Sequence, residues 1–181
     1  MKNIAVVLFL LVSFSTYAQK YFTKTGNTKF KASVEAFEPV EATNNSTTAI
    51  INVGSGEVAA LLFMKAFNFR VALMQEHFNE NYMDSSTFPK ATFKGIISDF
   101  NFSEISSTEK KHLLKGTLTV RGVEKEIETL ARFSKKEDKL LMETSFRVKP
   151  EDFNIKIPKI VSNKIAGTIN ISLAYEFIEK K

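Results

Sequence analysis

The chain has 181 residues, a formal net charge of +5 at pH 7, 17 phenylalanines, no tryptophan and no cysteine. This length suits one domain, and because a chain of about 150 residues buries roughly 70% of its unfolded surface, a core can form without disulfides. The missing cysteine excludes thiolate metal sites and cysteine nucleophiles, and the scatter of basic among acidic residues argues against a nucleic-acid binder.

The N-terminal segment, residues 1–18, has the pattern of a secretory signal peptide. Lys2 gives a basic start, an apolar run extends from Ile4 to Phe14, and small and polar residues precede Ala18. The apolar run is shorter than the ~20 residues that a bilayer-spanning helix needs. We therefore expect cleavage after Ala18, a periplasmic or secreted protein, and one domain over residues 19–181. The alternative is an N-terminal membrane anchor.

The next part of the chain predicts strands separated by glycine and by one helix. Gly54-Ser55-Gly56 predicts a hairpin turn, and Gly26 predicts a bend in the first strand. The strands expected here are Tyr21–Ser33, Ser46–Val53, Glu57–Phe69 and Lys90–Phe100. Between them, Ala72–Met83 lacks the strand period and fits one side of a short helix, which ends before Pro89.

The second half of the chain shows the strand period most clearly. Arg121-Gly122 predicts a tight turn between two strands, whereas Lys110-Lys111-His112 is interpreted as part of a solvated loop. Apolar residues alternate with polar ones in four strands. Their mainly apolar faces hold Leu114, Gly116, Leu118 and Val120; Val123, Lys125, Ile127, Thr129, Ala131 and Phe133; Leu140, Met142, Thr144, Phe146 and Val148; and Ile169, Ile171, Leu173, Tyr175 and Phe177. About eight antiparallel strands with one apolar face predict an all-β fold, either a two-sheet sandwich or an up-and-down barrel.

Several segments, in order and at the right spacing, resemble the YceI family of exported lipid-binding proteins. They are Phe67-x-Phe69, Leu73-Met74-Gln75-Glu76-His77-Phe78-Asn79, Phe88-Pro89-Lys90-Ala91-Thr92-Phe93-Lys94-Gly95, Gly116-Thr117-Leu118-Thr119-Val120-Arg121-Gly122-Val123, Asp152-Phe153-Asn154-Ile155 with Pro158, and Lys164-Ile165. The resemblance implies a lipocalin-like antiparallel barrel with a short helix near one end. It further implies an interior that holds a long apolar chain, such as a polyisoprenoid, an isoprenoid quinone tail or a fatty acyl lipid.

The residues agree with such a ligand, because a long apolar chain gains ~0.8 kcal/mol for each CH₂ that leaves water. Each candidate could instead be ordinary core, so the hypothesis concerns the set. The expected ligand-binding residues are Phe67, Phe69, Met74, His77, Phe78, Met83, Phe93, Leu118, Ile127, Met142, Phe146, Ile171, Leu173 and Tyr175.

Little in the sequence indicates catalysis. His77 and His112 are the only histidines and lack metal-ligand spacing, and no Gly-x-Ser-x-Gly nucleophile motif is present. We expect no enzyme activity, metal or cofactor. His77, with Asn81, could contact a ligand headgroup, although a solvated or packing role is the simpler interpretation.

Two readings of function stay open on the sequence. The first is a soluble carrier of an apolar chain, for which an interior open along the barrel axis would be evidence. The second is a solidly packed barrel that acts as a structural or protein-interaction module without a lipid. The basic loop with Lys149, Lys156, Lys159 and Lys164 fits ordinary solvation, and under the first reading also fits transient contact with a membrane surface.

Overall fold

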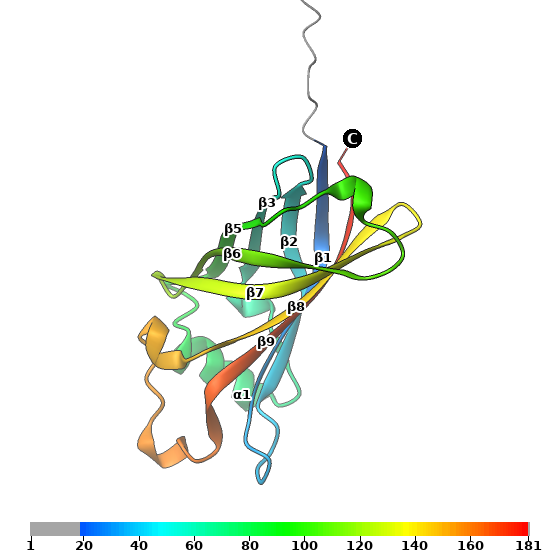
Figure 1. Ribbon diagram of the computed structural model, residues 1–181. Coiled ribbons are helices and arrows are strands. Elements are labelled where there is room, and N and C mark those ends of the chain that lie inside the picture. The colour runs from blue at the N-terminus through cyan, green and yellow to red at the C-terminus, as the bar shows by residue number, and fades with distance from the viewer. Residues whose placement is uncertain (1–18, 181) are drawn as a thin grey trace, which may run out of the picture.

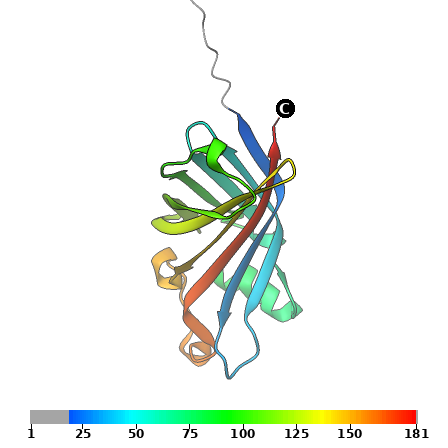
Figure 2. The same ribbon diagram turned by 45° about the vertical axis from the view of Figure 1, so that its right-hand side comes forward.

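The computed structural model describes residues 19–180, so the expected signal peptide lies outside the described residues. The strands form one closed antiparallel sheet in which β9 returns to β1 and β1 pairs with β2 (Figures 1 and 2). The closure confirms the up-and-down barrel and decides against a sandwich of two sheets. Eight strands make the wall, and the two-residue strand β4 adds to the edge of β2.

The elements are mostly strands with short helical turns between them. The barrel strands are β1 (Lys20–Ser33), β2 (Glu41–Asn52), β3 (Glu57–Phe63), β5 (Lys90–Ile97), β6 (Lys110–Val120), β7 (Val123–Lys136), β8 (Lys139–Val148) and β9 (Ile165–Glu179), with β4 at Asn68–Phe69. The helical segments are α1 (Ala72–His77), the π-helical turn η2 (Phe78–Tyr82), and the 3₁₀ turns η1 (Met64–Ala66), η3 (Phe102–Glu104), η4 (Pro150–Phe153) and η5 (Lys159–Val161).

Strand β6 begins earlier than the sequence predicted. Lys110 already pairs with Phe133, so the interpretation of Lys110-Lys111-His112 as a loop is wrong. His112 faces inward and is only 7% exposed. Its ring packs edge-on against Phe100 and Phe133, with centroid distances of 5.4 and 5.9 Å. Lys110 and Lys111 are exposed, whereas the ring of His112 is buried. Three basic residues in a row can therefore belong to a strand, because a histidine can pack its ring in the core.

In β1 and β2, the alternation of inward-facing and outward-facing residues is interrupted at one shared irregularity in their pairing. Gly26 pairs with Thr47, but Thr28 pairs with Asn44, so β2 has one extra residue at this point, and β1 has one extra residue between Thr23 and Gly26. The fully buried side chain of Asn44 holds the bulge: its Oδ1 accepts hydrogen bonds from the Ser46 amide and hydroxyl, and its Nδ2 donates to the Phe63 carbonyl. The bend expected at Gly26 is therefore a paired irregularity of both strands.

The predicted strand Glu57–Phe69 and the predicted helix Ala72–Met83 are each divided in two. Strand β3 ends at Phe63, η1 follows, and the chain resumes pairing only at β4. The helix begins as α1 and widens into η2, where the Met83 amide donates to the Phe78 carbonyl at 2.9 Å. This wider turn places Met83 in the interior, where it is buried.

The interior has a packed half at the end of the barrel where the two described ends of the chain lie (Figure 1). Phe133, Phe177 and Leu140 are fully buried there. The loop between β5 and β6 covers this end, with Ile105 buried and Phe102 packed 5.0 Å from the ring of Tyr21. We call this region the packed core; its buried residues are Tyr21, Ala49, Ile51, Val53, Val58, Ile97, Ile105, Leu114, Ala131, Phe133, Leu140, Met142, Tyr175 and Phe177.

The outer surface of the barrel is polar and carries cross-strand ion pairs. Lys115 pairs with Glu128 at 2.9 Å, and Arg132 with Glu143 at 2.7 Å. These pairs are exposed to solvent and therefore contribute little to stability. Within residues 19–180, no helix is long and apolar enough to cross a membrane.

Candidate ligand cavity

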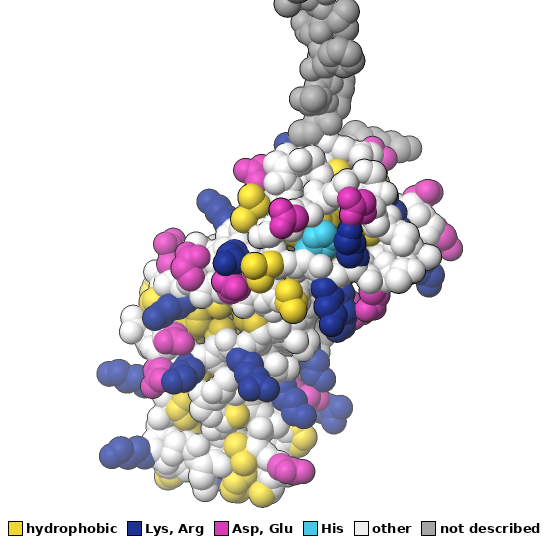
Figure 3. Space-filling view, in the orientation of Figure 1, with side chains coloured by type: hydrophobic (Ala, Val, Ile, Leu, Met, Phe, Trp, Pro, Cys, Tyr) yellow, Lys and Arg dark blue, Asp and Glu magenta, His cyan; other side chains and the backbone are white. Residues whose placement is uncertain are grey.

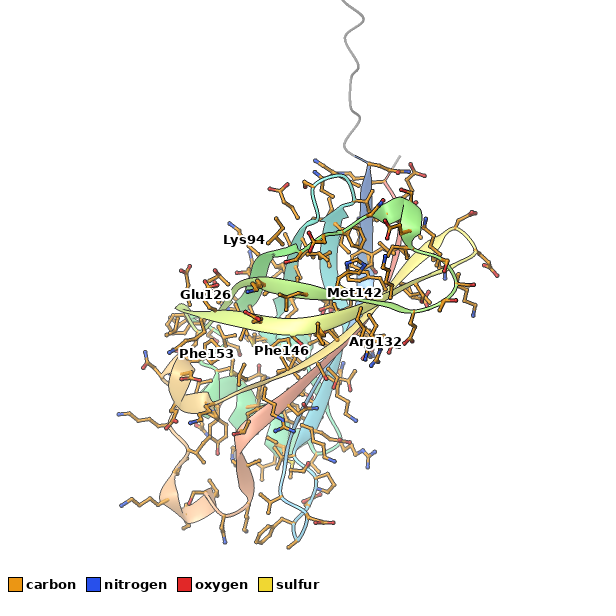
Figure 4. All side chains as sticks on the ribbon, viewed as in Figure 1. Lys94, Glu126, Arg132, Met142, Phe146 and Phe153 are labelled. Carbon is orange, nitrogen blue, oxygen red and sulfur yellow. The ribbon has the colours of Figure 1, made fainter. Side chains whose placement is uncertain are left out.

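The half of the barrel opposite the packed core encloses a cavity of about 380 Å³. This volume lies within the ~300–1,000 Å³ typical of ligand pockets. The wall is almost entirely apolar and is built by the barrel strands, by α1 and η2, and by the segment after β8. Phe146 of β8 and Phe153 of η4 show how neighbouring elements contribute to one wall (Figure 4). The interior is thus neither open along the whole axis nor solidly packed.

All the residues that the sequence singled out for ligand binding lie on this cavity wall. The strand residues face inward from β5 to β9, and the others come from η1–β4 and the helix. The lining residues predicted from the sequence are Phe67, Phe69, Met74, His77, Phe78, Met83, Phe93, Leu118, Ile127, Met142, Phe146, Ile171, Leu173 and Tyr175. Their contact with a ligand stays a prediction, and Asn81, proposed beside His77, is not part of the wall.

Four phenylalanines join the helix to the barrel at the open half of the cavity. Phe30 of β1 stacks on Phe78 of η2 with a centroid distance of 5.3 Å, and it meets Phe67 and Phe69 edge-on at 5.4 and 5.6 Å. The helix is tied further by Gln75, whose Oε1 accepts from the Phe69 amide at 3.3 Å. Aromatic pairs of this kind contribute ~0.5–1.5 kcal/mol beyond burial, so they fix α1 against the wall.

A glycine pair makes room for Phe93 on the opposite wall. Gly95 of β5 pairs with Gly116 of β6, and a Cβ at either position would come within 2.7 Å of the Phe93 ring. The ring therefore lies across both glycines. Side chains at these two positions would meet the paired backbone first, at the carbonyl oxygens of Lys115 and Lys94, and then the Phe93 ring, so the glycines let the strands pair closely beneath the ring.

A cluster of hydroxyl groups lies at the inner end of the cavity, next to the packed core. We call Thr28, Thr47 and Tyr175 the hydroxyl cluster; all three line the cavity, and each is less than 5% exposed. Thr28 Oγ1 lies 2.8 Å from both Thr47 Oγ1 and the Tyr175 hydroxyl. Burial raises the pKa of Tyr175 above its ordinary value of 10.0, and its hydrogen bond with Thr28 acts in the opposite direction.

The sequence did not identify the lining residues of β1, β2 and the segment after β8. The alternation of Thr28, Phe30 and Ala32 is typical of a strand. In β2, however, the bulge at Asn44 exchanges the inward-facing and outward-facing positions, so simple alternation along β2 assigns the wrong faces. The missed lining residues include Thr28, Phe30, Ala32, Val40, Thr47, Ile155, Ile157 and Val161.

The cavity reaches the surface between α1 and the segment around η5. His77 and Lys164 both line it and are themselves exposed. Lys164 Nζ lies 6.0 Å from the ring centroid of Phe37, which connects this segment to the β1–β2 hairpin. We call this end of the barrel the mouth. Exposed apolar side chains surround it, with Ile160 at 85% exposure and Leu73 at 56%.

The chemistry that this wall offers is binding of apolar groups. Carboxylates and histidines do not cluster as a metal site anywhere in residues 19–180. The polar groups on the wall are chiefly neutral hydroxyls, with Lys164 and His77 at the mouth. Fold and cavity together define an antiparallel β-barrel built to hold an apolar molecule, the class of lipid-binding barrels.

The particular family follows from the sequence match. The YceI-like domain model matches residues 13–177, and the chain belongs to this family. No curated protein matches the chain.

Solved structures show the same fold at low sequence identity. A polyisoprenoid-binding domain from Saccharophagus degradans, implicated in plant cell wall breakdown, superposes with a TM-score of 0.78 at 13% identity, covering 89% of this chain and 98% of that domain. BcnA from Burkholderia cenocepacia gives 0.69 at 14% identity, covering 83% and 95%. The Campylobacter jejuni YceI protein gives 0.63 at 18% identity, covering 80% and 87%. At these identities the likeness concerns the fold alone.

Proposed function

We propose that this protein is an exported, non-enzymatic carrier that sequesters a long apolar chain, a polyisoprenoid, isoprenoid quinone tail or fatty acyl lipid, in its barrel. The observation that carries the proposal is the apolar cavity of about 380 Å³ in the half of the barrel that the packed core leaves free. Membership in the YceI-like family, and a structural neighbour described as polyisoprenoid-binding, support the ligand class.

The size of the hydrophobic effect explains why the ligand should be long. Ten buried CH₂ groups gain roughly 8 kcal/mol. Association costs ~4–15 kcal/mol in lost translational and rotational freedom. A short chain therefore binds weakly in a wall without charged anchors, whereas a chain of about fifteen or more carbons binds well.

Contact of the mouth with a membrane surface is the second part of the proposal. Exposed Ile160, Leu73 and Phe37 surround the mouth. Lys and Arg side chains gather on the lower half of the face in Figure 3, near this end; exposed Lys156 and Lys159 belong to the segment between β8 and β9. Apolar tips beside lysines fit an anionic bilayer surface. A ligand could then pass between membrane and cavity without crossing water.

The alternative of a solidly packed interaction module fits the structure less well. It requires side chains to fill the whole interior, whereas the half that holds the second hydrophobic cluster, around Phe30 and Phe67, keeps a cavity of about 380 Å³. We therefore give the carrier reading preference.

The carrier proposal is tested by extracting protein purified from its own host with organic solvent and analysing the extract by mass spectrometry. We expect one long-chain apolar species in near-stoichiometric amount. Protein that yields no lipid, and that takes up no polyprenyl chain after refolding, would overturn the proposal.

Export is tested on the same material. Intact-mass measurement should give a chain that begins at Gln19. A chain that retains residues 1–18 in a membrane fraction would support an anchor instead.

A further inference from the structure

We propose that the hydroxyl cluster binds a neutral oxygen, a carbonyl or hydroxyl, at the innermost end of the ligand. The inference rests on the carrier function proposed above and adds the chemistry and orientation of the bound molecule. Three buried polar side chains, Thr28, Thr47 and Tyr175, line the mostly apolar cavity where it meets the packed core.

The cluster retains hydrogen-bonding capacity after its internal bonds are counted. Three hydroxyl groups carry three donor hydrogens and six acceptor lone pairs. The bonds from Thr28 to Thr47 and to Tyr175 use two hydrogens, whichever atom donates. Within the described part of the chain, no backbone carbonyl accepts a hydrogen bond from these hydroxyls. One donor therefore remains, on a hydroxyl of a residue that lines the cavity.

A second pair of threonines in the barrel provides an internal comparison. The Thr129 hydroxyl donates to the Ser145 carbonyl at 2.9 Å, and the Thr144 hydroxyl donates to the Leu130 carbonyl at 2.9 Å. Their donors are thus committed to the strands, and this pair serves structure alone. The hydroxyl cluster differs because its bonds run only among its own members.

The charge of the wall restricts the oxygen to a neutral group. The cluster lies next to the packed core, and the ionisable side chains on the wall other than tyrosine are His77 and Lys164 at the mouth. Burying an unpaired carboxylate or phosphate would cost far more than a hydroxyl hydrogen bond returns. A ligand with a charged headgroup must therefore leave it at the mouth, and its neutral end enters first.

The cluster is held rigidly in place. The ring of Tyr175 packs against Gly26, and Thr47 follows the bulge that Asn44 fixes. The three residues come from three adjacent strands, and β1 is hydrogen-bonded to both β2 and β9. Because no loop contributes, the hydroxyls are positioned before a ligand arrives.

The test compares two probes of matched chain length and branching, the alcohol farnesol and the hydrocarbon farnesene. Refolded, lipid-free protein is titrated with each probe by displacement of a neutral fluorescent naphthylamine. The variant Thr28→Val, Thr47→Val, Tyr175→Phe removes all three hydroxyls with little change in shape. We expect it to bind farnesol about five- to tenfold more weakly, the loss of one buried hydrogen bond, and farnesene no more weakly than before.

The matched control is Thr129→Val, which removes a cavity hydroxyl whose donor the backbone already uses. It should change the affinity for both probes equally. If the triple variant also changes both equally, the cluster has no recognition role and the inference is overturned while the carrier function stands. If neither probe displaces the dye from the unmodified protein, the carrier function itself fails. Circular dichroism of each variant verifies folding, and Tyr175→Phe alone is the fallback should the triple variant not fold.

Discussion

The ring of Tyr175 packs directly against the backbone of Gly26. A Cβ atom at position 26 would lie 2.6 Å from Cδ1 of that ring and 3.1 Å from the Thr47 carbonyl oxygen. The contact joins β1 to β9 at the inner end of the cavity, between the packed core and the ligand space. Glycine is required here by space, since only a residue without a side chain lets the ring lie this close.

Gly26→Ala should therefore destabilise the protein. The added methyl group must displace Tyr175 or the backbone of β2, an overpacking that costs typically 1–3 kcal/mol. Urea unfolding followed by circular dichroism measures the effect. Gly167→Ala is the control, because a Cβ at that position meets no atom within 4 Å. Equal midpoints for the two variants would contradict the proposed contact.

Filling the cavity should block uptake of a lipid without unfolding the barrel. Ala60 lines the cavity, so Ala60→Phe places a ring in the ligand space. We expect at least a tenfold loss of affinity for farnesol or a longer polyprenol, measured by dye displacement. Ala59→Phe adds the same ring at the next position of β3, which is not part of the wall, and should bind normally. Unchanged binding in Ala60→Phe would show that the ligand lies elsewhere.

Membrane contact should depend on the apolar tip of the mouth. Ile160→Glu replaces an 85% exposed isoleucine with a charge, which should slow lipid transfer from anionic vesicles severalfold. Transfer between donor and acceptor vesicles that carry a fluorescent lipid measures the rate. Leu130→Glu makes the same change at a 57% exposed residue on the outer face of β7 and should have no effect. Equal rates in all three proteins would argue against docking through the mouth.

Stability should fall at alkaline pH because of Tyr175. Burial raises the pKa of this residue above 10.0, so above that pH the unfolded chain loses the proton while the folded protein keeps it. The stabilisation is thus complete below the unfolded pKa and declines as pH rises toward the folded one. Urea midpoints between about pH 8 and pH 11 should show this decline, and Tyr175→Phe should reduce it. A decline of the same size in Tyr175→Phe would assign it to other groups.

The sequence predicted the second half of the barrel well, because in these strands inward-facing and outward-facing residues alternate without interruption. Leu118, Ile127, Phe146 and Leu173 lie on the cavity wall as their alternation indicated. The alternation of apolar and polar residues could not show whether the sheet closes on itself, so it allowed either a sandwich or a barrel. The pairing of β1 with both β2 and β9 decides between them, and pairing between distant strands leaves no local pattern.

The first half was harder to predict for a physical reason. At the paired irregularity, Asn44 and Thr47 both face inward although three positions separate them, so strict alternation assigns one of them to the wrong face. Two of the three residues of the hydroxyl cluster lie on these strands. From the sequence alone, a polar residue that faces the interior of such a strand cannot be told from one that faces solvent. The contacts made in the folded protein are needed to assign it.

Within residues 19–180, the packed core closes one end of the ligand space. Phe133, Phe177 and Leu140 obstruct the axis at one end, so a bound chain cannot thread through the molecule and leave on the far side. Loading and release must use the same route in reverse order, and the segment that enters first departs last. The rate of exchange is then set by how quickly a chain slides back out, so a longer chain should stay bound for a longer time.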